Sequence, residues 1–177
     1  LVTALNLKDG QVLWERQMDS TPCVAPLESG GSVFLALEDG TVMLLDAESG
    51  EPKAERVLKN KAVLDPLPWD RGAILFLEDG RIVWLESEQG TKSKQRRVTA
   101  MPTTAYRNKN HLVVGSAMGV IDCFSPLTAE VLYTYDTESD APIDQIVAHS
   151  DRVFAVIGKS RLVCLNPSSL QIAGEFT

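Results

Sequence analysis

Short apolar runs recur along the chain at intervals of about forty residues. The run at 33–37 (VFLAL) is followed by Glu-Asp-Gly and then by a second apolar run, and the same order returns at 73–77 (AILFL) without a gap. Two weaker copies follow at 112–124 and 152–165. One apolar column of this alignment reads Leu5, Leu45, Leu85, Phe124 and Leu165. A fixed spacing of this length is typical of a repeat architecture.

Each repeat contains three turns and is therefore expected to form four short antiparallel strands. The Asp-Gly pairs at 39–40 and 79–80 predict tight hairpins, for which a type I′ turn is the expected geometry. Turns at 47–50 and 28–31 separate the outer strands from the inner ones. The inner runs are continuously apolar and do not alternate, which predicts strands buried on both faces. Four-stranded sheets with both faces buried, repeated in series, predict an all-β fold, the β-propeller.

About four and a half repeats fit into the 177 residues, which predicts a partial ring in a single domain. The expected boundaries are a half blade at 1–17 and blades at 18–58, 59–98, 99–138 and 139–177. Segment 51–64 is rich in helix formers, but the repeat favours a strand there. A partial ring leaves two apolar blade faces open, so we expect self-association through the open blade edges.

Residues 4–14 (ALNLKDGQVLW) resemble the repeat of the quinoprotein-type, or PQQ-like, propeller family. That repeat has a strand ending in Ala-Leu-Asp, a Gly-containing turn, and a Trp four residues after the Gly, which here is Trp14 after Gly10. Segment 44–50 is similar but lacks the Trp. The Trp column continues as Ala54, Lys94, Tyr133 and Gly174. The resemblance implies that the Trp docking between neighbouring blades is mostly lost in this chain.

Composition and charge limit the classes of partner. The net charge is −7, with 44% hydrophobic residues, which argues against nucleic acid as a partner because phosphate binding needs clustered cations. No apolar run approaches the roughly 20 residues of a membrane-spanning helix, so no membrane span is expected. PQQ-like propellers are often extracytoplasmic, which favours a periplasmic or extracellular location. The three separated cysteines point weakly in the other direction.

The sequence predicts no catalytic, cofactor-binding or metal-binding residues, and so no enzyme. The quinone dehydrogenases of the family, as the resemblance implies, need an adjacent Cys pair and acidic and amide ligands for Ca²⁺ beside the quinone. Here Cys123 and Cys164 stand in a column of apolar residues and are expected to be buried. The run from His149 to Asp151 cannot form a catalytic triad, because neighbouring side chains of a strand point to opposite faces.

Candidate contacts with a partner protein come from the turns. They are Trp69, Asp70, Arg71, Tyr106, Arg107 and His149. An exposed Trp69 would be a good contact anchor, but its ring could equally fold down onto Pro66 and Pro68. The basic run of Lys92, Lys94, Arg96 and Arg97 is expected to protect an outer strand from edge-to-edge pairing, with an acidic partner as the alternative.

Three functions remain open at this point. The first is a non-catalytic scaffold or sensor module of a larger protein, which binds protein partners without a cofactor. The second is a fragment of a PQQ- and calcium-dependent quinoprotein dehydrogenase. The third is a carbohydrate- or cell-wall-binding propeller, for which only Trp69 and Tyr106 offer stacking rings.

Overall fold

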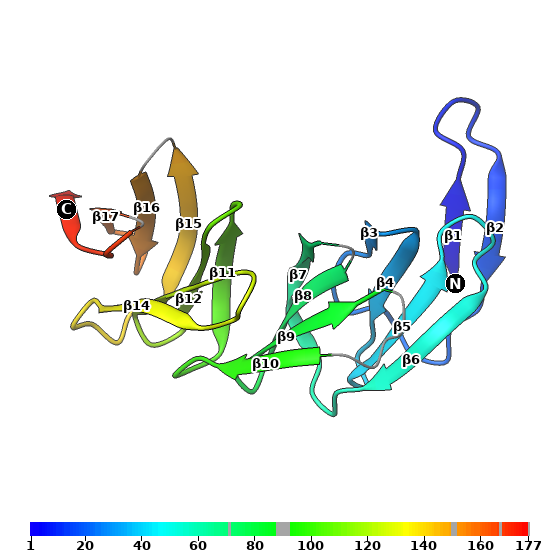
Figure 1. Ribbon diagram of the computed structural model, residues 1–177, viewed down its shortest axis with the longest axis horizontal. Helices are drawn as coiled ribbons and strands as arrows, with labels where there is room; N and C mark the ends of the chain where they lie inside the picture. Colours follow the sequence, from blue (N-terminus) through cyan, green and yellow to red (C-terminus); the bar gives the residue numbers. More distant parts are fainter. Residues whose placement is uncertain (71, 88–92, 150–151, 167, 177) are drawn as a thin grey trace. The chain divides into compact units, whose positions relative to one another are not determined.

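The structure, a computed structural model, describes the chain except residues 71, 88–92, 150–151, 167 and 177 (Figure 1). The described residues form eighteen strands and no helix. The chain divides into two compact units, Leu1–Phe76 with Val83–Lys94, and Leu77–Ile82 with Gln95–Thr177. That residues 1–177 form a single domain remains a prediction.

The first unit begins with a two-stranded sheet and continues with four-stranded antiparallel sheets. Its short first sheet pairs β1 (Val2–Leu5) with β2 (Val12–Arg16). The next sheet runs in chain order through β3 (Leu27–Ser29), β4 (Ser32–Ala36), β5 (Thr41–Asp46) and β6 (Pro52–Val57). The following sheet contains β7 (Ala62–Trp69), β8 (Gly72–Leu77), β9 (Arg81–Glu86) and β10 (Ser93–Arg97), with the β8–β9 turn and the end of β10 grouped in the second unit.

The second unit holds two more sheets of the same topology. One contains β11 (Pro102–Arg107), β12 (Leu112–Ser116), β13 (Val120–Phe124) and β14 (Val131–Asp136). The other contains β15 (Ile143–His149), β16 (Arg152–Ile157), β17 (Arg161–Leu165) and β18 (Ile172–Phe176). Consecutive strands are neighbours in every sheet, as the three turns per repeat predict. Strands β6 and β7 occupy most of segment 51–64, so the preference for strand over helix is confirmed there.

The strand register confirms the repeat alignment. In four of the five sheets the last two strands pair in the same way, through Ala4–Trp14, Leu44–Ala54, Cys123–Tyr133 and Cys164–Gly174. In all four sheets the register shifts directly after this pair. The Trp column read from the sequence is therefore a structural column on the outermost strand.

The hairpins lie where the Asp-Gly pairs predict them, but their turn type differs from the expected one. Gly40 and Gly80 have φ of 80° and 83°, whereas Asp39 and Asp79 are not among the residues with positive φ. The Gly40 amide donates to the Leu37 carbonyl at 3.0 Å, and the Leu37 amide donates to the Thr41 carbonyl at 2.8 Å. This is a three-residue loop with a left-handed glycine, not a type I′ turn.

Inner strands form the core and outer strands face solvent. Every residue of β8 is buried, whereas every residue of β10 is exposed. The predicted apolar column is fully buried at Leu45, Leu85, Phe124 and Leu165. Leu5, the first member, is 53% exposed, since its sheet has only two strands.

Candidate protein-interaction sites

The first group of predicted contact residues lies at the end of β7. The Trp69 side chain is only 8% exposed, and the Lys94 ammonium lies 5.7 Å from the centre of its ring. Asp70 is exposed in the turn, with a φ of 48°, and Arg71 lies outside the described residues. The structure therefore places Trp69 inside the protein, as in the alternative interpretation, and leaves little of its ring for a partner.

The second group lies in the second unit, at the ends of β11 and β15. Tyr106 and Arg107 are half-buried, and Tyr106 packs against the apolar cluster that includes Ile146. His149 is exposed at the end of β15, and its neighbours Ser150 and Asp151 lie outside the described residues. Two threonines join these strands: Thr103 Oγ1 donates to the Ile143 carbonyl at 2.6 Å, and Thr104 Oγ1 accepts from the Ile146 amide at 3.2 Å.

Two residues of the basic run around β10 make contacts with other residues of the chain. Arg97 Nη2 lies 3.6 Å from Asp79 Oδ2, and Lys94 lies over Trp69. Arg96 is exposed, and Lys92 lies outside the described residues. These contacts, together with the exposure of the whole strand, fit the expected protection of an outer edge.

Strand β14 is an exposed outer edge of a different kind. Its first three residues, Val131, Leu132 and Tyr133, are 52%, 40% and 40% exposed, and its first charged residue is Asp136 at its end. Aromatic and β-branched side chains favour strand pairing, and nothing charged on this segment opposes it. Sequence reasoning missed this surface, although the absence of charge in 131–135 is visible in the sequence.

Hydrogen-bonding groups of β14 point away from its sheet. The Thr137 amide donates to the Gly119 carbonyl at 3.1 Å, which makes this pair a hydrogen-bonded one. Bonded and non-bonded pairs alternate in an antiparallel ladder, so the pair Asp122–Thr134 is a non-bonded one. The Thr134 amide and carbonyl therefore face the free edge, where an added strand would bind.

The side chains of the same pair face each other. Thr134 Oγ1 donates to Asp122 Oδ1 at 2.6 Å. Asp122 is buried, and this burial raises the pKa of its carboxyl group, while the hydrogen bond from Thr134 lowers it in part.

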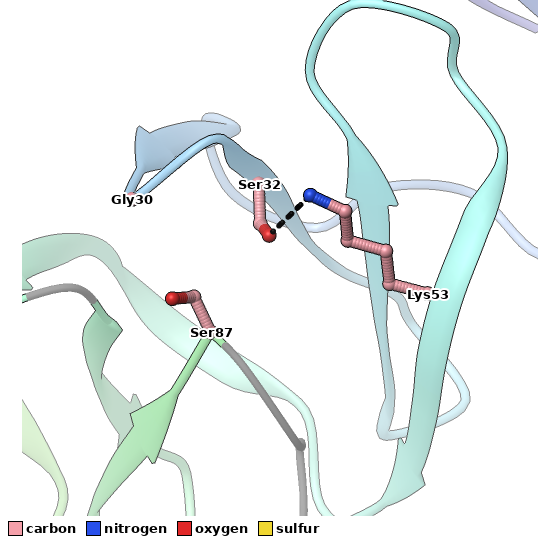
Figure 2. A pocket seen from close by; sticks show the side chains of 4 residues that line it. All are labelled: Gly30, Ser32, Lys53 and Ser87. Carbon is pink, nitrogen blue, oxygen red and sulfur yellow. Dashed lines mark hydrogen bonds between the residues drawn. The ribbon is translucent and has the colours of Figure 1, made fainter.

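A cavity of about 390 Å³ with a mixed polar and apolar lining lies between β4, β6 and the end of β9 in the first unit (Figure 2). Its lining residues are Gly30, Ser32, Lys53 and Ser87. The Lys53 ammonium contacts three oxygen atoms, Gly31 O at 2.6 Å, Ser32 Oγ at 3.3 Å and Asp46 Oδ2 at 2.9 Å. These contacts use its three donors and neutralise its charge.

Ser87 differs from the other lining residues because its hydroxyl has no partner. Its side chain is 4% exposed, and Oγ makes no hydrogen bond with any described residue. A buried hydroxyl without a partner costs free energy, and Ser87 Oγ has almost no solvent-accessible surface.

Trp14 binds the turn after β5 elsewhere in the same unit. Its Nε1 donates to the Ala47 carbonyl at 3.1 Å, and Arg16 Nη1 donates to the Gly50 carbonyl at 3.0 Å. The ring lies so close to Gly50 that a Cβ atom there would be 2.6 Å from Trp14 Cδ2. The Trp docking that the family resemblance implies is thus present at Trp14, the one position of the Trp column where the sequence has a Trp.

Cys123 is poorly placed for nucleophilic chemistry. All three are free thiols, and burial raises the pKa of Cys123 to about 11, with the nearby Asp122 charge adding to the effect. Thiols with raised pKa are weak nucleophiles at neutral pH. The described residues contain no group of three or more His, Cys, Asp or Glu side chains that could hold a metal ion. They also contain no helix long and apolar enough to cross a membrane.

The sheets, their shared register and the Trp14 docking define the class of protein, a partial β-propeller of PQQ-like repeats. Comparison with family models identifies a family for the chain. Residues 1–171 match the family described as outer membrane protein assembly factor BamB, and the chain belongs to this family. No curated protein sequence matches the chain.

Solved structures show the same fold at low sequence identity. BamB from Moraxella catarrhalis superposes with a TM-score of 0.79 at 14% identity, over 94% of this chain and 56% of that protein. The chain thus spans little more than half the length of that relative. The computationally designed protein Ika4 superposes with a TM-score of 0.73 at 17% identity, over 89% of this chain and 98% of Ika4. The designed protein Ika8 gives 0.64 at 14% identity, over 94% and 65%.

Proposed function

We propose that the chain is a non-catalytic scaffold module that binds another protein, and that the partner adds a strand to the free edge of β14. The family description, an outer membrane assembly factor, supports a protein-binding role and an extracytoplasmic location. The exposed apolar start of β14 is the single observation that carries the site. Added strands gain affinity from main-chain hydrogen bonds and specificity from alternate side chains.

Strands β6 and β10 support this choice, whereas β18 (IAGEF) is like β14 in carrying a single charge, Glu175, which pairs with Arg161 of the neighbouring strand. Strand β10 (SKQRR) carries three cations and β6 (PKAERV) three charged residues, and charges of this kind oppose pairing with a further strand. Strand β14 (VLYTYD) carries one charge, at its end. The partner segment is therefore extended and partly apolar, and it faces Leu132 and the outward backbone groups of Thr134.

The test exposes the wild-type chain and two variants to an extract of the organism that makes it, and compares the proteins that each one retains. Leu132→Lys places a cation on the proposed edge, and Val57→Lys does the same on exposed β6 as a matched control. Both sites are exposed, so each change should alter stability by less than about 0.5 kcal/mol. We expect one partner to be retained by the wild-type and Val57→Lys chains and lost by Leu132→Lys. Equal capture by all three would contradict the β14 site.

A separate assay addresses the quinoprotein alternative. Quinone and Ca²⁺ added to the parent protein should produce no alcohol-dependent dye reduction if the module is non-catalytic. Turnover in this assay would overturn the non-catalytic role, whatever the result at β14.

A further inference from the structure

One face of the sheet β15–β18 carries apolar side chains on all four strands. Residues that pair across neighbouring strands point to the same face, so the register gives the members of that face. They form two rows, Val147–Phe154–Cys164–Gly174 and Gln145–Val156–Leu162–Phe176. Neither row contains a charged residue, and Val147 and Phe176 are 47% and 63% exposed. We call this surface the open face.

The opposite face of the same sheet is packed inside the second unit. It carries Ala155 and Val163, which are buried in one cluster with Cys123 of the preceding sheet. Cys123 stands in the column of Cys164, a member of the open face. The open face therefore repeats the surface that the preceding sheet buries against its neighbour, and it has the chemistry to pack against a neighbour of the same kind.

The two-stranded sheet β1–β2 carries the matching side of such a junction. Inside the second unit, the surface that covers Cys123 includes Val163 and Leu165, which are both buried. Their positions in the repeat are held in β1 by Thr3 and Leu5. Leu5 is 53% exposed, so this side of the junction is uncovered in the first unit.

The exposed surface of β1–β2, which we call the outer face, has two leucines at its centre. Leu5 and Leu13 are 53% and 57% exposed, and the Glu15 carboxylate beside them accepts a hydrogen bond of 3.4 Å from Thr3 Oγ1. Trp14 points the other way, because successive side chains of a strand alternate, and packs against the cluster of Leu45.

We propose that the open face of one copy of the chain binds the outer face of a second copy, with Leu5 and Leu13 packed on Leu162 and Phe176. One contact of this kind buries both apolar surfaces, whereas an unrelated protein would cover only one of them. Each copy contributes a different surface, so the interface is heterologous and continues into a ring or an open chain of copies. This inference goes beyond the proposed function and does not depend on the edge of β14.

The test follows two variants of the 177-residue chain by sedimentation equilibrium. Leu5→Lys places a cation on the outer face and Phe176→Lys places one on the open face, and both sites are exposed. Each variant alone should associate roughly tenfold or more weakly than the wild type, as when an apolar anchor is lost from an interface. Val57→Lys, on exposed β6, is the matched control and should associate like the wild type.

Mixing the two variants distinguishes this interface from a symmetric one. The Phe176→Lys copy keeps its outer face and the Leu5→Lys copy keeps its open face, so an equimolar mixture should form a one-to-one dimer. A mixture that stays monomeric would overturn the proposal. Undiminished self-association of either variant alone would also overturn it, because the contact would then join two identical surfaces or two strand edges.

Two further results count against the proposal. One is a wild-type chain that stays monomeric at the highest attainable concentration, and the other is equal loss of association in Val57→Lys. Melting temperatures show whether each variant is folded. Leu13→Lys replaces Leu5→Lys, and Leu162→Lys replaces Phe176→Lys, if either variant fails to fold.

Discussion

The indole nitrogen of Trp14 donates a hydrogen bond of 3.1 Å to the carbonyl oxygen of Ala47. This bond connects β2 to the turn after β5, and the ring lies flush against Gly50, which has a φ of 73°. Glycine is needed there both for the positive φ and for the close approach of the ring. The short first sheet is held to its neighbour through this contact.

Removal of the Trp14 ring should therefore destabilise the chain. Trp14→Ala should lower the free energy of unfolding by about 3 kcal/mol, since a large packed ring is lost. Trp14→Phe keeps most of the packing and should cost about 1 kcal/mol for the hydrogen bond. Denaturant titration measures both. The adjacent Leu13 is exposed, and Leu13→Ala should stay within about 0.5 kcal/mol. A neutral Trp14→Ala would mean that the ring does not anchor the sheet.

Substitution of Trp69 tests whether its ring is exposed or buried. An exposed ring could be truncated at a cost below about 0.5 kcal/mol. The ring is buried, so Trp69→Ala should cost about 3 kcal/mol, comparable to the 2–5 kcal/mol expected for Leu45→Ala or Leu85→Ala. Thermal and denaturant unfolding give these values. A stability unchanged by Trp69→Ala would return this residue to the contact candidates.

Much of the fold follows from the sequence because the repeat is visible as a column. Leu45, Leu85, Phe124 and Leu165 are spaced at the repeat length and are all fully buried. The same spacing places strands in segment 51–64, where local helix propensity alone would mislead. A repeated environment constrains each copy more strongly than intrinsic propensity does.

The candidate sites were less predictable from the sequence than the fold was. Trp69 departs from its column of small or polar turn residues, but a column cannot show whether a ring turns outward or inward. Whether the buried Ser87 hydroxyl finds a partner is a property of side-chain packing, which the repeat pattern does not show. The edge of β14 could have been found from its lack of charge beside the cations of β10.

Asp122 makes stability depend on pH. Its carboxyl pKa is raised in the folded state by burial, above the value of about 3.9 in an unfolded chain. Below that value both states are protonated and folding carries no penalty. As pH rises through the unfolded and then the folded pKa, the unfolded state releases the proton more readily and stability falls.

Asp122→Asn removes this penalty and should retain the hydrogen bond from Thr134. We expect the variant to be more stable than the wild type at pH 7 and to show no such gain at pH 3. Unfolding by urea at both pH values measures the difference. Thr134→Val removes the hydroxyl that stabilises the carboxylate and should cost more at pH 7 than at pH 3. A pH-independent effect of Asp122→Asn would contradict the buried ionisable role.

Self-association is expected at the two-stranded sheet. Three apolar side chains around it, Leu5, Leu7 and Val12, are exposed, and β1 lacks a neighbour on one side. Light scattering should show a mass that rises with concentration, and Leu5→Lys should reduce this rise. A monomer at the highest attainable concentration would disprove association through this edge.

The most direct test of the account is hydrogen exchange at the Thr134 amide, compared between the isolated chain and its complex with the captured partner. This amide faces the free edge of β14, so it should exchange rapidly in the isolated chain. If the partner adds a strand, the Thr134 amide becomes strongly protected, whereas the exposed amides of β6 do not change. A complex in which the exchange of Thr134 is unaltered would contradict strand addition at β14.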